Sequence, residues 1–256
     1  MWRGQEPGGY TQLANRDFNT TTEDGWTTAA AGGSTANFTI TTDATAPHSP
    51  SNVGQINYPT SPTPFGDGTE PVKTFKGANG KKLYVCHNFK YSSNWVGHPS
   101  GTNKIIHHFS DSTGTANRIF SVGFGDGANP LQPGFGLQGI ASNFDFNAQG
   151  GGFSSAATTG WLFPNQPGHT NDQLVRGTWY QLEYLLDLGT AGNADGRVDW
   201  WINGVLIGSV INIPITSVTA LFNEIDWAPT WGGFSGATLT VDQQEWMDAL
   251  YASYHL

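Results

Sequence analysis

Hydrophobic and polar residues alternate along several stretches of this chain with the two-residue period of a β-strand. The clearest example lies between residues 82 and 90, where the positions fall into two sets. One set is Leu83, Val85, His87 and Phe89, and the other is Tyr84, Cys86, Asn88 and Lys90. Comparable stretches predict strands at 36–41, 55–58, 104–109, 118–124, 135–140, 179–188, 196–202, 205–208, 221–227 and 237–242. Residues 245–251 are predicted as a short helix or a final strand.

The dipeptide Asn203-Gly204 separates two of these stretches and is typical of the type I′ turn of a β-hairpin. The chain also has 34 glycines and 14 prolines without a fixed period, as expected for turns between many short strands. These features predict an all-β protein, a two-sheet antiparallel β-sandwich of the jelly-roll type. We expect one domain over residues 1–256, with loop-rich edge strands in 1–65 and the main sandwich in 66–256.

Charge narrows the range of partners. The chain has 11 Lys and Arg against 20 Asp and Glu, a net charge of −9. Nucleic-acid binding is not expected, because it needs a clustered basic surface. No apolar run is long enough to cross a bilayer, and the start of the chain does not read as a signal peptide, so membrane insertion is not expected either. Cys86 is the single cysteine and is predicted to be a buried small hydrophobic residue.

Several segments carry a resemblance to a known group of proteins. They are FKYSSNWVGH at 89–98, NKI at 103–105, RVDWWING at 197–204, APTWGG at 228–233, ANRDFN at 14–19 and EDGW at 23–26. Together they resemble the concanavalin A-like lectin/glucanase superfamily. More narrowly, they are similar to polysaccharide-lyase-like jelly rolls of bacterial or phage type, near the heparinase I and glucuronan lyase families. The resemblance implies the same sandwich fold and a polysaccharide or other glycan as partner.

In those lyases, a polar or cationic side chain neutralises the carboxylate of a uronic acid, and a His or Tyr removes the C5 proton. The resemblance implies Asn103 or Lys104 as the neutralising group and His108 or Tyr184 as the base. His108 is preferred to His107, because alternate strand positions share a face and Lys104 is four residues before His108. The alternative is that both histidines are partly buried and hydrogen-bonded within the strand.

Other features of the sequence argue against a lyase or a glucanase. The Gln-Ile-His and Tyr-Phe-Lys-x-Gly-x-Tyr motifs of the alginate-lyase branch are absent, as is its Arg-Ser/Asn-Glu-Leu motif. Glu224 and Asp226 only partly match the catalytic strand of a glucanase, which needs a further Glu as acid/base.

Carbohydrate binding without catalysis requires aromatic rings for stacking and polar groups around them. Residues in or beside loops supply both, although some of the tryptophans would instead seal the ends of the sandwich. The candidate ligand-binding residues are Trp95, His98, Gln138, Trp161, Gln181 and Trp231.

A structural calcium site is one interpretation of the loop that contains Asp187, Asn193 and Asp195, because these residues offer oxygen ligands. The other interpretation is a glycine-rich hairpin loop with Asx turns. No cofactor is otherwise required.

Two functions therefore follow from the sequence. The first is a carbohydrate-binding or surface-display domain, outside the cell or on a virion surface, with assembly partners in a virion or filament. The alternative is a polysaccharide lyase that cleaves uronate-containing glycans by β-elimination.

Overall fold

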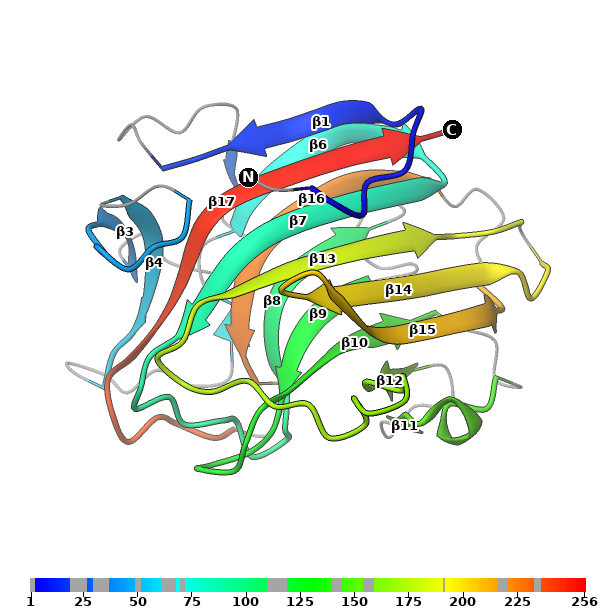
Figure 1. Cartoon of the computed structure of the whole chain (residues 1–256). Coiled ribbons are helices and arrows are strands. Elements are labelled where there is room, and N and C mark those ends of the chain that lie inside the picture. Colours follow the sequence, from blue (N-terminus) through cyan, green and yellow to red (C-terminus); the bar gives the residue numbers. More distant parts are fainter. Residues whose placement is uncertain are drawn as a thin grey trace.

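The computed structural model describes residues 3–18, 27–29, 37–48, 52–60, 68–69, 72–109, 119–139, 144–153, 159–190, 192–215, 221–232 and 236–256. Within them, strands form two antiparallel sheets that pack face to face (Figure 1). The predicted all-β sandwich is thus confirmed. A short 3-10 helix, η2 (Asn147–Gln149), interrupts the strands. The resemblance segment at 23–26 lies outside the described residues.

One sheet has eight strands, in the order β15, β14, β13, β7, β17, β4 and β3, and β1 pairs with β17. Their bounds are β1 Thr11–Arg16, β3 Phe38–Thr41, β4 Val53–Tyr58, β7 Lys82–Tyr91, β13 Tyr180–Asp187, β14 Gly196–Ile202, β15 Val205–Ile213 and β17 Gln243–His255. β1, β3 and β4 come from the predicted edge region. β1 and β4 pair with the long C-terminal strand β17, and β3 pairs with β4 at the edge of the sheet.

The other sheet has nine strands, in the order β11, β12, β10, β9, β8, β16, β6 and β2, and β5 pairs with β16. Their bounds are β2 Thr27–Ala29, β5 Gly68–Thr69, β6 Val72–Gly80, β8 Asn103–Phe109, β9 Ile119–Phe124, β10 Gln132–Gln138, β11 Gly152–Phe153, β12 Thr159–Leu162 and β16 Phe222–Trp231.

The hairpin prediction is confirmed. Asn203 and Gly204 have φ values of 50° and 79° between β14 and β15, as a type I′ turn requires. The strand predicted at 237–242 is wrong. Residues two apart in a strand share a face, yet Leu239 is 3% exposed and Val241 is 38% exposed. The chain bends there instead, and the Asp242 carboxylate accepts hydrogen bonds from Thr60 N–H at 2.7 Å and its hydroxyl at 2.6 Å. The alternatives for 245–251 resolve as a strand, within β17.

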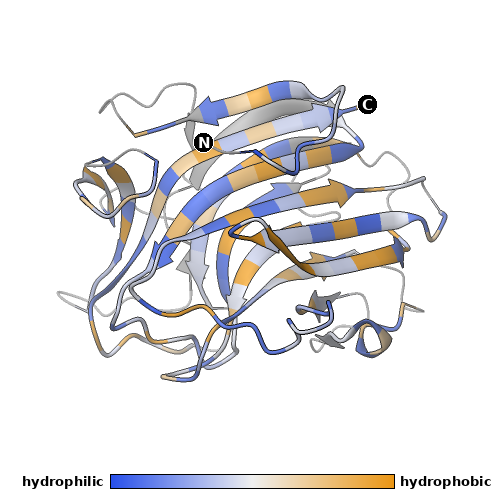
Figure 2. Ribbon diagram, in the orientation of Figure 1, coloured by the Kyte–Doolittle hydropathy of each residue, from blue (hydrophilic) through white to orange (hydrophobic). Residues whose placement is uncertain are grey.

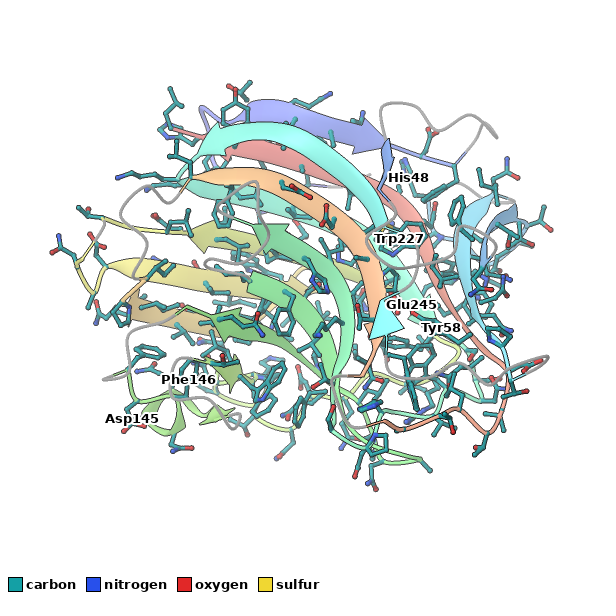
Figure 3. The ribbon with its side chains drawn as sticks, turned by 180° about the vertical axis from the view of Figure 1, so that it is seen from behind. His48, Tyr58, Asp145, Phe146, Trp227 and Glu245 are labelled. Atoms are coloured by element: carbon teal, nitrogen blue, oxygen red, sulfur yellow. The ribbon has the colours of Figure 1, made fainter. Side chains whose placement is uncertain are left out.

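Large aromatic rings fill the space between the sheets. The Phe135 ring lies 5.1 Å from that of Tyr184 and 5.4 Å from that of Trp200, so β10, β13 and β14 meet in the core. Hydrophilic and hydrophobic residues follow one another along the strands of the sandwich (Figure 2). Ionisable side chains also enter this interior. Figure 3 labels one of them, Glu245, which is 1% exposed.

The N-terminal segment 3–10 covers part of the outer face of the eight-stranded sheet. Glu6 Oε1 accepts hydrogen bonds from Tyr251 Oη and Ser253 Oγ, each at 2.6 Å. The backbone N–H of Gln5 donates to Glu183 Oε2 at 3.2 Å. Cys86, on the same outer face, is therefore buried, as predicted. No helix among the described residues has the length and hydrophobicity needed to span a membrane.

Candidate functional site

Three of the four predicted catalytic residues lie inside the sandwich. Tyr184 Oη and His108 Nε2 are 2.8 Å apart, His108 Nδ1 lies 3.1 Å from Ile119 O, and both side chains are fully buried. Burial lowers the pKa of His108 to about 3 and raises the pKa of Tyr184 well above its usual value. A base in this position has no surface on which to meet a polysaccharide.

Asn103 is also fully buried. Its Nδ2 donates to Gly123 O at 2.8 Å and Gly125 O at 3.0 Å, and its Oδ1 accepts from Trp95 Nε1 at 3.3 Å. These bonds join β8 to the end of β9 and to the loop that follows it. The amide is therefore occupied by the fold and does not reach a substrate carboxylate.

Trp95, in a loop, and Trp231, the last residue of β16, were candidates for stacking on a sugar, and each is only 2% exposed. Trp231 Nε1 donates to Val96 O at 2.7 Å, and its ring packs edge-on against His98, which is fully buried. These rings seal one end of the sandwich, which is the alternative that the sequence left open. Neither ring has a face available for stacking on a sugar.

The remaining residues predicted to bind a ligand do not lie on one surface. Gln138 lies on β10 of the nine-stranded sheet and Gln181 on β13 of the eight-stranded sheet, and both side chains are partly exposed. Trp161, on β12, is also partly exposed, and it belongs to a group of side chains on the outer face of the nine-stranded sheet.

A β-bulge in β8 decides which histidine joins that face. Lys104 pairs with Val122, and His107 pairs with Phe120, so three residue steps on β8 match two on β9. The extra residue shifts the alternation of side chains. Lys104 Nζ lies 5.3 Å from the centroid of the Phe120 ring, and the His107 ring centroid lies 5.5 Å from it. The expectation that His108 shares the face of Lys104 is therefore wrong, and His107 occupies that face.

Strand register aligns His107 with residues on four other strands of the nine-stranded sheet. Asp226 on β16 pairs with His107, His107 with Phe120, Phe120 with Gly136 on β10, and Gly136 with Trp161. We call these five residues the cross-sheet row. Asp226 and His107 are 6% and 4% exposed, whereas Trp161 is partly exposed. The row thus runs from a carboxylate and an imidazole to an indole.

Gly136 allows the two aromatic rings of the row to meet. A Cβ at this position would overlap the Phe120 ring and lie 2.6 Å from Trp161 Cζ3. The Phe120 and Trp161 rings are 5.5 Å apart, edge to face. The ring of Phe124 lies 5.3 Å from Trp161 and 5.1 Å from Phe163. These four rings form an aromatic platform beside Lys104, and its outer members Trp161, Phe124 and Phe163 are partly exposed.

The predicted calcium ligands already have protein partners. Asp187 Oδ2 forms an ion pair with Lys82 Nζ at 3.0 Å, and its Oδ1 accepts Gly189 N–H at 2.9 Å. Asp195 Oδ1 accepts a hydrogen bond from Thr190 N–H at 2.7 Å. Hydrogen bonds from the backbone and the side chain of Thr190 lower the pKa of Asp195. Among the described residues, no group of three or more His, Cys, Asp or Glu side chains is placed to hold a metal ion. The calcium site stays a prediction.

Sequence reasoning missed His107, Phe120, Phe124 and Phe163 as members of one surface. The alternation in 118–124 gives the shared face of Phe120 and Phe124, but the bulge that adds His107 has no sequence signal comparable to the Asn-Gly turn.

No protein family model and no curated protein matches this chain. Solved structures match over almost its whole length. The marine PL-14 alginate lyase from Aplysia kurodai is 10% identical with a TM-score of 0.65, covering 94% of this chain and 98% of that one. The endo-β-1,4-glucuronan lyase from the fungus Trichoderma reesei is 12% identical with a TM-score of 0.56, covering 96% of each chain. A mutant alginate lyase solved with an alginate tetrasaccharide is 12% identical with a TM-score of 0.58, covering 94% and 96%.

The protein therefore has the concanavalin A-like jelly-roll fold, in the form found in alginate and glucuronan lyases. At these identities the likeness establishes the fold, and function has to be argued from the side chains of this chain.

Proposed function

We propose that this protein binds a polysaccharide across the outer face of its nine-stranded sheet. The aromatic platform beside Lys104 is the observation that carries the proposal, because the rings of Trp161, Phe124 and Phe163 and the side chain of Lys104 are all partly exposed on one face. Carbohydrate sites need this combination, since the ring covers the apolar face of a sugar and polar groups bind its hydroxyls. The alginate tetrasaccharide bound by a lyase of the same fold supports a glycan as partner.

Affinity gel electrophoresis tests the binding, with alginate, polyglucuronate and a neutral β-glucan each cast into the gel. Trp161→Ala is expected to raise the dissociation constant obtained from the retardation at least tenfold, which corresponds to about 1.4 kcal/mol of binding free energy. Trp246→Ala is the matched control, because Trp246 is a partly exposed tryptophan on β17 of the opposite sheet. Equal retardation of Trp161→Ala and the unaltered protein by every polysaccharide would contradict the proposal.

A second candidate function is β-elimination on a uronate polysaccharide. It is favoured by the β8 bulge, which brings Lys104 and His107 to one aromatic ring on one face. Lys104, which is partly exposed, would neutralise the uronate carboxylate. The His107 imidazole lies on the same outer face but is 4% exposed, so it would accept the C5 proton only after the side chains that cover it move aside. The C4–O bond then breaks, its electrons leave with the departing sugar oxygen, and a C4–C5 double bond forms.

The unsaturated product absorbs at about 235 nm, which gives a direct assay. If the chain is a lyase, His107→Gln abolishes the increase in absorbance, whereas His255→Gln leaves it unchanged because His255 lies on the opposite sheet. A chain that binds a polyuronate but produces no absorbance is a binding protein and not a lyase.

A location outside the cell or on a virion surface belongs to the same proposal, because that is where a protein meets structural polysaccharides. Immunogold labelling of producing cells and of particles from them tests it, and label confined to the cell interior would contradict it.

A further inference from the structure

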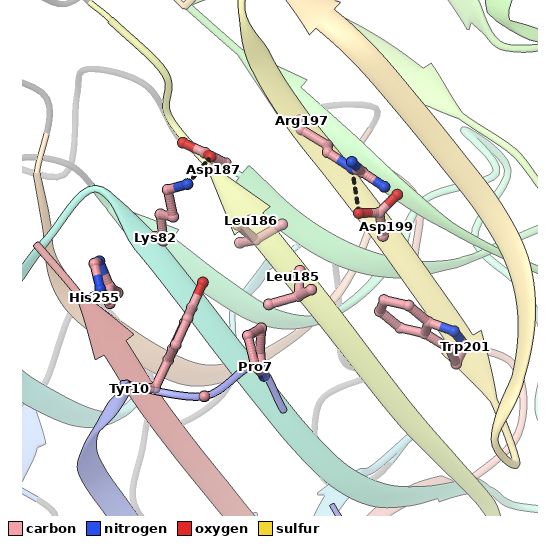
Figure 4. Close-up of a pocket in the computed structure, with 11 residues that line it drawn as sticks. Pro7, Tyr10, Lys82, Leu185, Leu186, Asp187, Arg197, Asp199, Trp201 and His255 are labelled. Carbon is pink, nitrogen blue, oxygen red and sulfur yellow. Dashed lines mark hydrogen bonds and ion pairs between the residues drawn. The ribbon is translucent and has the colours of Figure 1, made fainter. Parts of the chain in front are cut away.

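A pocket of about 450 Å³ lies on the outer face of the eight-stranded sheet, opposite the cross-sheet row (Figure 4). The N-terminal segment forms one wall with Pro7, Gly8 and Tyr10. β13 and β14 supply the floor and the opposite wall, and His255 closes one side. The volume falls within the range of roughly 300–1,000 Å³ typical of small-molecule sites.

Two ion pairs line the pocket. Lys82 Nζ lies 3.0 Å from Asp187 Oδ2, and Arg197 Nε lies 2.5 Å from Asp199 Oδ2. The two cationic side chains are 47% and 55% exposed, so their remaining N–H groups face solvent. Ser209 Oγ donates to Asp199 Oδ1 at 2.5 Å, which fixes that carboxylate. The four charges balance, and each pair presents donors and acceptors side by side.

Aromatic and apolar side chains complete the lining. Trp201 stands at one end and Tyr10 at the other, with Leu185 between them (Figure 4). The Tyr10 ring lies 5.5 Å from the His255 ring. Burial, and then the charge of Asp187, raise the pKa of Tyr10 to about 12. The Tyr10 hydroxyl therefore keeps its proton at neutral pH and can donate a hydrogen bond.

We infer that this pocket binds an uncharged sugar unit of a saccharide, at a site separate from the nine-stranded sheet. A sugar hydroxyl both donates and accepts, so it can bind either ion pair without breaking it. A carboxylated sugar would add an unbalanced negative charge between Asp187 and Asp199, in a molecule of net charge −9. A purely apolar ligand would take the remaining N–H groups of Lys82 and Arg197 out of water without giving them hydrogen-bond acceptors.

The inference goes beyond the proposed function, because the two surfaces lie on opposite sheets. A protein with both sites can hold two saccharide chains, or two regions of one branched chain. Linked occupancy then raises the overall affinity without new contacts.

Isothermal titration with cellohexaose and laminarihexaose, and with an oligoglucuronate for comparison, tests the site on the full chain. We expect a neutral hexasaccharide to bind more tightly than the oligoglucuronate at this site. Trp201→Ala is expected to weaken the neutral saccharide at least tenfold, and Tyr10→Phe to weaken it severalfold while keeping the ring. Ile211→Ala is the control, because Ile211 is 51% exposed on β15 and is not part of the lining.

The Trp161→Ala variant separates this inference from the proposed function. If neutral saccharide still binds Trp161→Ala and is lost only in Trp201→Ala, the pocket is a site of its own, whatever the nine-stranded sheet binds. If Trp161→Ala abolishes all binding, or if the folded Trp201→Ala and Tyr10→Phe variants bind like the unaltered protein, the inference is overturned. Melting curves of both variants establish that they are folded.

Discussion

Two histidines in the interior of the sandwich make its stability sensitive to acid. His87 and His108 are fully buried, and burial lowers the pKa of each to about 3, with the neighbouring His108 as a further cause for His87. An unfolded histidine titrates near 6.5. Below that pH the unfolded chain binds more protons than the folded one, so the stability is present above 6.5 and is lost as the pH falls toward 3.

The magnitude follows from the shift. One pH unit corresponds to about 1.4 kcal/mol, so lowering the pH from 6.5 to 5.0 costs about 2 kcal/mol for each histidine. His87→Leu isolates one of them. The ring nitrogens of His87 have no hydrogen-bond partner among the described residues, and the ring packs 5.6 Å from Phe89 and 6.2 Å from Tyr184. Leucine keeps this site apolar and removes the titrating group.

Urea unfolding of both proteins at pH 7.5 and pH 5.0 measures the effect. The free energy of unfolding of the unaltered protein, minus that of His87→Leu, is expected to fall by about 2 kcal/mol between the two pH values. This difference cancels the titration of groups that both proteins share. Ile211→Ala changes an exposed side chain that does not titrate, so the corresponding difference for this variant should be the same at both pH values. A difference for His87→Leu that stays constant with pH would refute the reasoning.

Four further predictions concern other buried or constrained groups. Burial raises the pKa of Glu245 well above its usual value, so the folded protein loses stability as the pH rises and this carboxyl group ionises. In urea unfolding, the free energy of unfolding of Glu245→Gln minus that of the unaltered protein should therefore be larger at pH 8 than at pH 4.5, by about 1.4 kcal/mol per pH unit of the shift. Gly136→Ala should lower the free energy of unfolding by about 1–3 kcal/mol, because the new methyl group overlaps two rings. Burial also raises the pKa of Cys86, so its thiol should react with a disulfide reagent only after denaturation, and rapid native-state labelling would contradict the packing of the N-terminal segment. Melting curves in EDTA and in millimolar calcium should superimpose, because Asp187 and Asp195 already have partners, and a rise with calcium would establish the predicted site.

Much of the fold could be predicted because strand period and turn chemistry are local. The alternation in 82–90 and the Asn203-Gly204 turn each give a strand or hairpin that the structure contains. The prediction at 237–242 used the same alternation and is wrong, because a loop residue such as Leu239 can be buried without a strand. Tertiary packing, and not local period, decides such cases.

The candidate site could be predicted far less well. Trp95 lies in a loop and Trp231 is the last residue of β16, and a position in or beside a loop does not distinguish a ring that seals the sandwich from one that faces solvent. Trp161 and Lys104 were candidates taken from separate segments, and what relates them to each other and to Phe120 and His107 is the pairing of β9 with β8 and β10. That pairing is long-range information.

Local irregularities of the strands decide which chemistry the nine-stranded sheet presents. An extra residue in β8 turns His107 outward, onto the same face as Lys104. On the other side of β8, an extra residue in β16 lies between Trp227, which pairs with Ile106, and Thr230, which pairs with Lys104. Without the β8 bulge, regular alternation would put His107 among the core rings and His108 on the outer face. The base and the cation of the proposed elimination therefore share a surface only because the strand departs from its regular period.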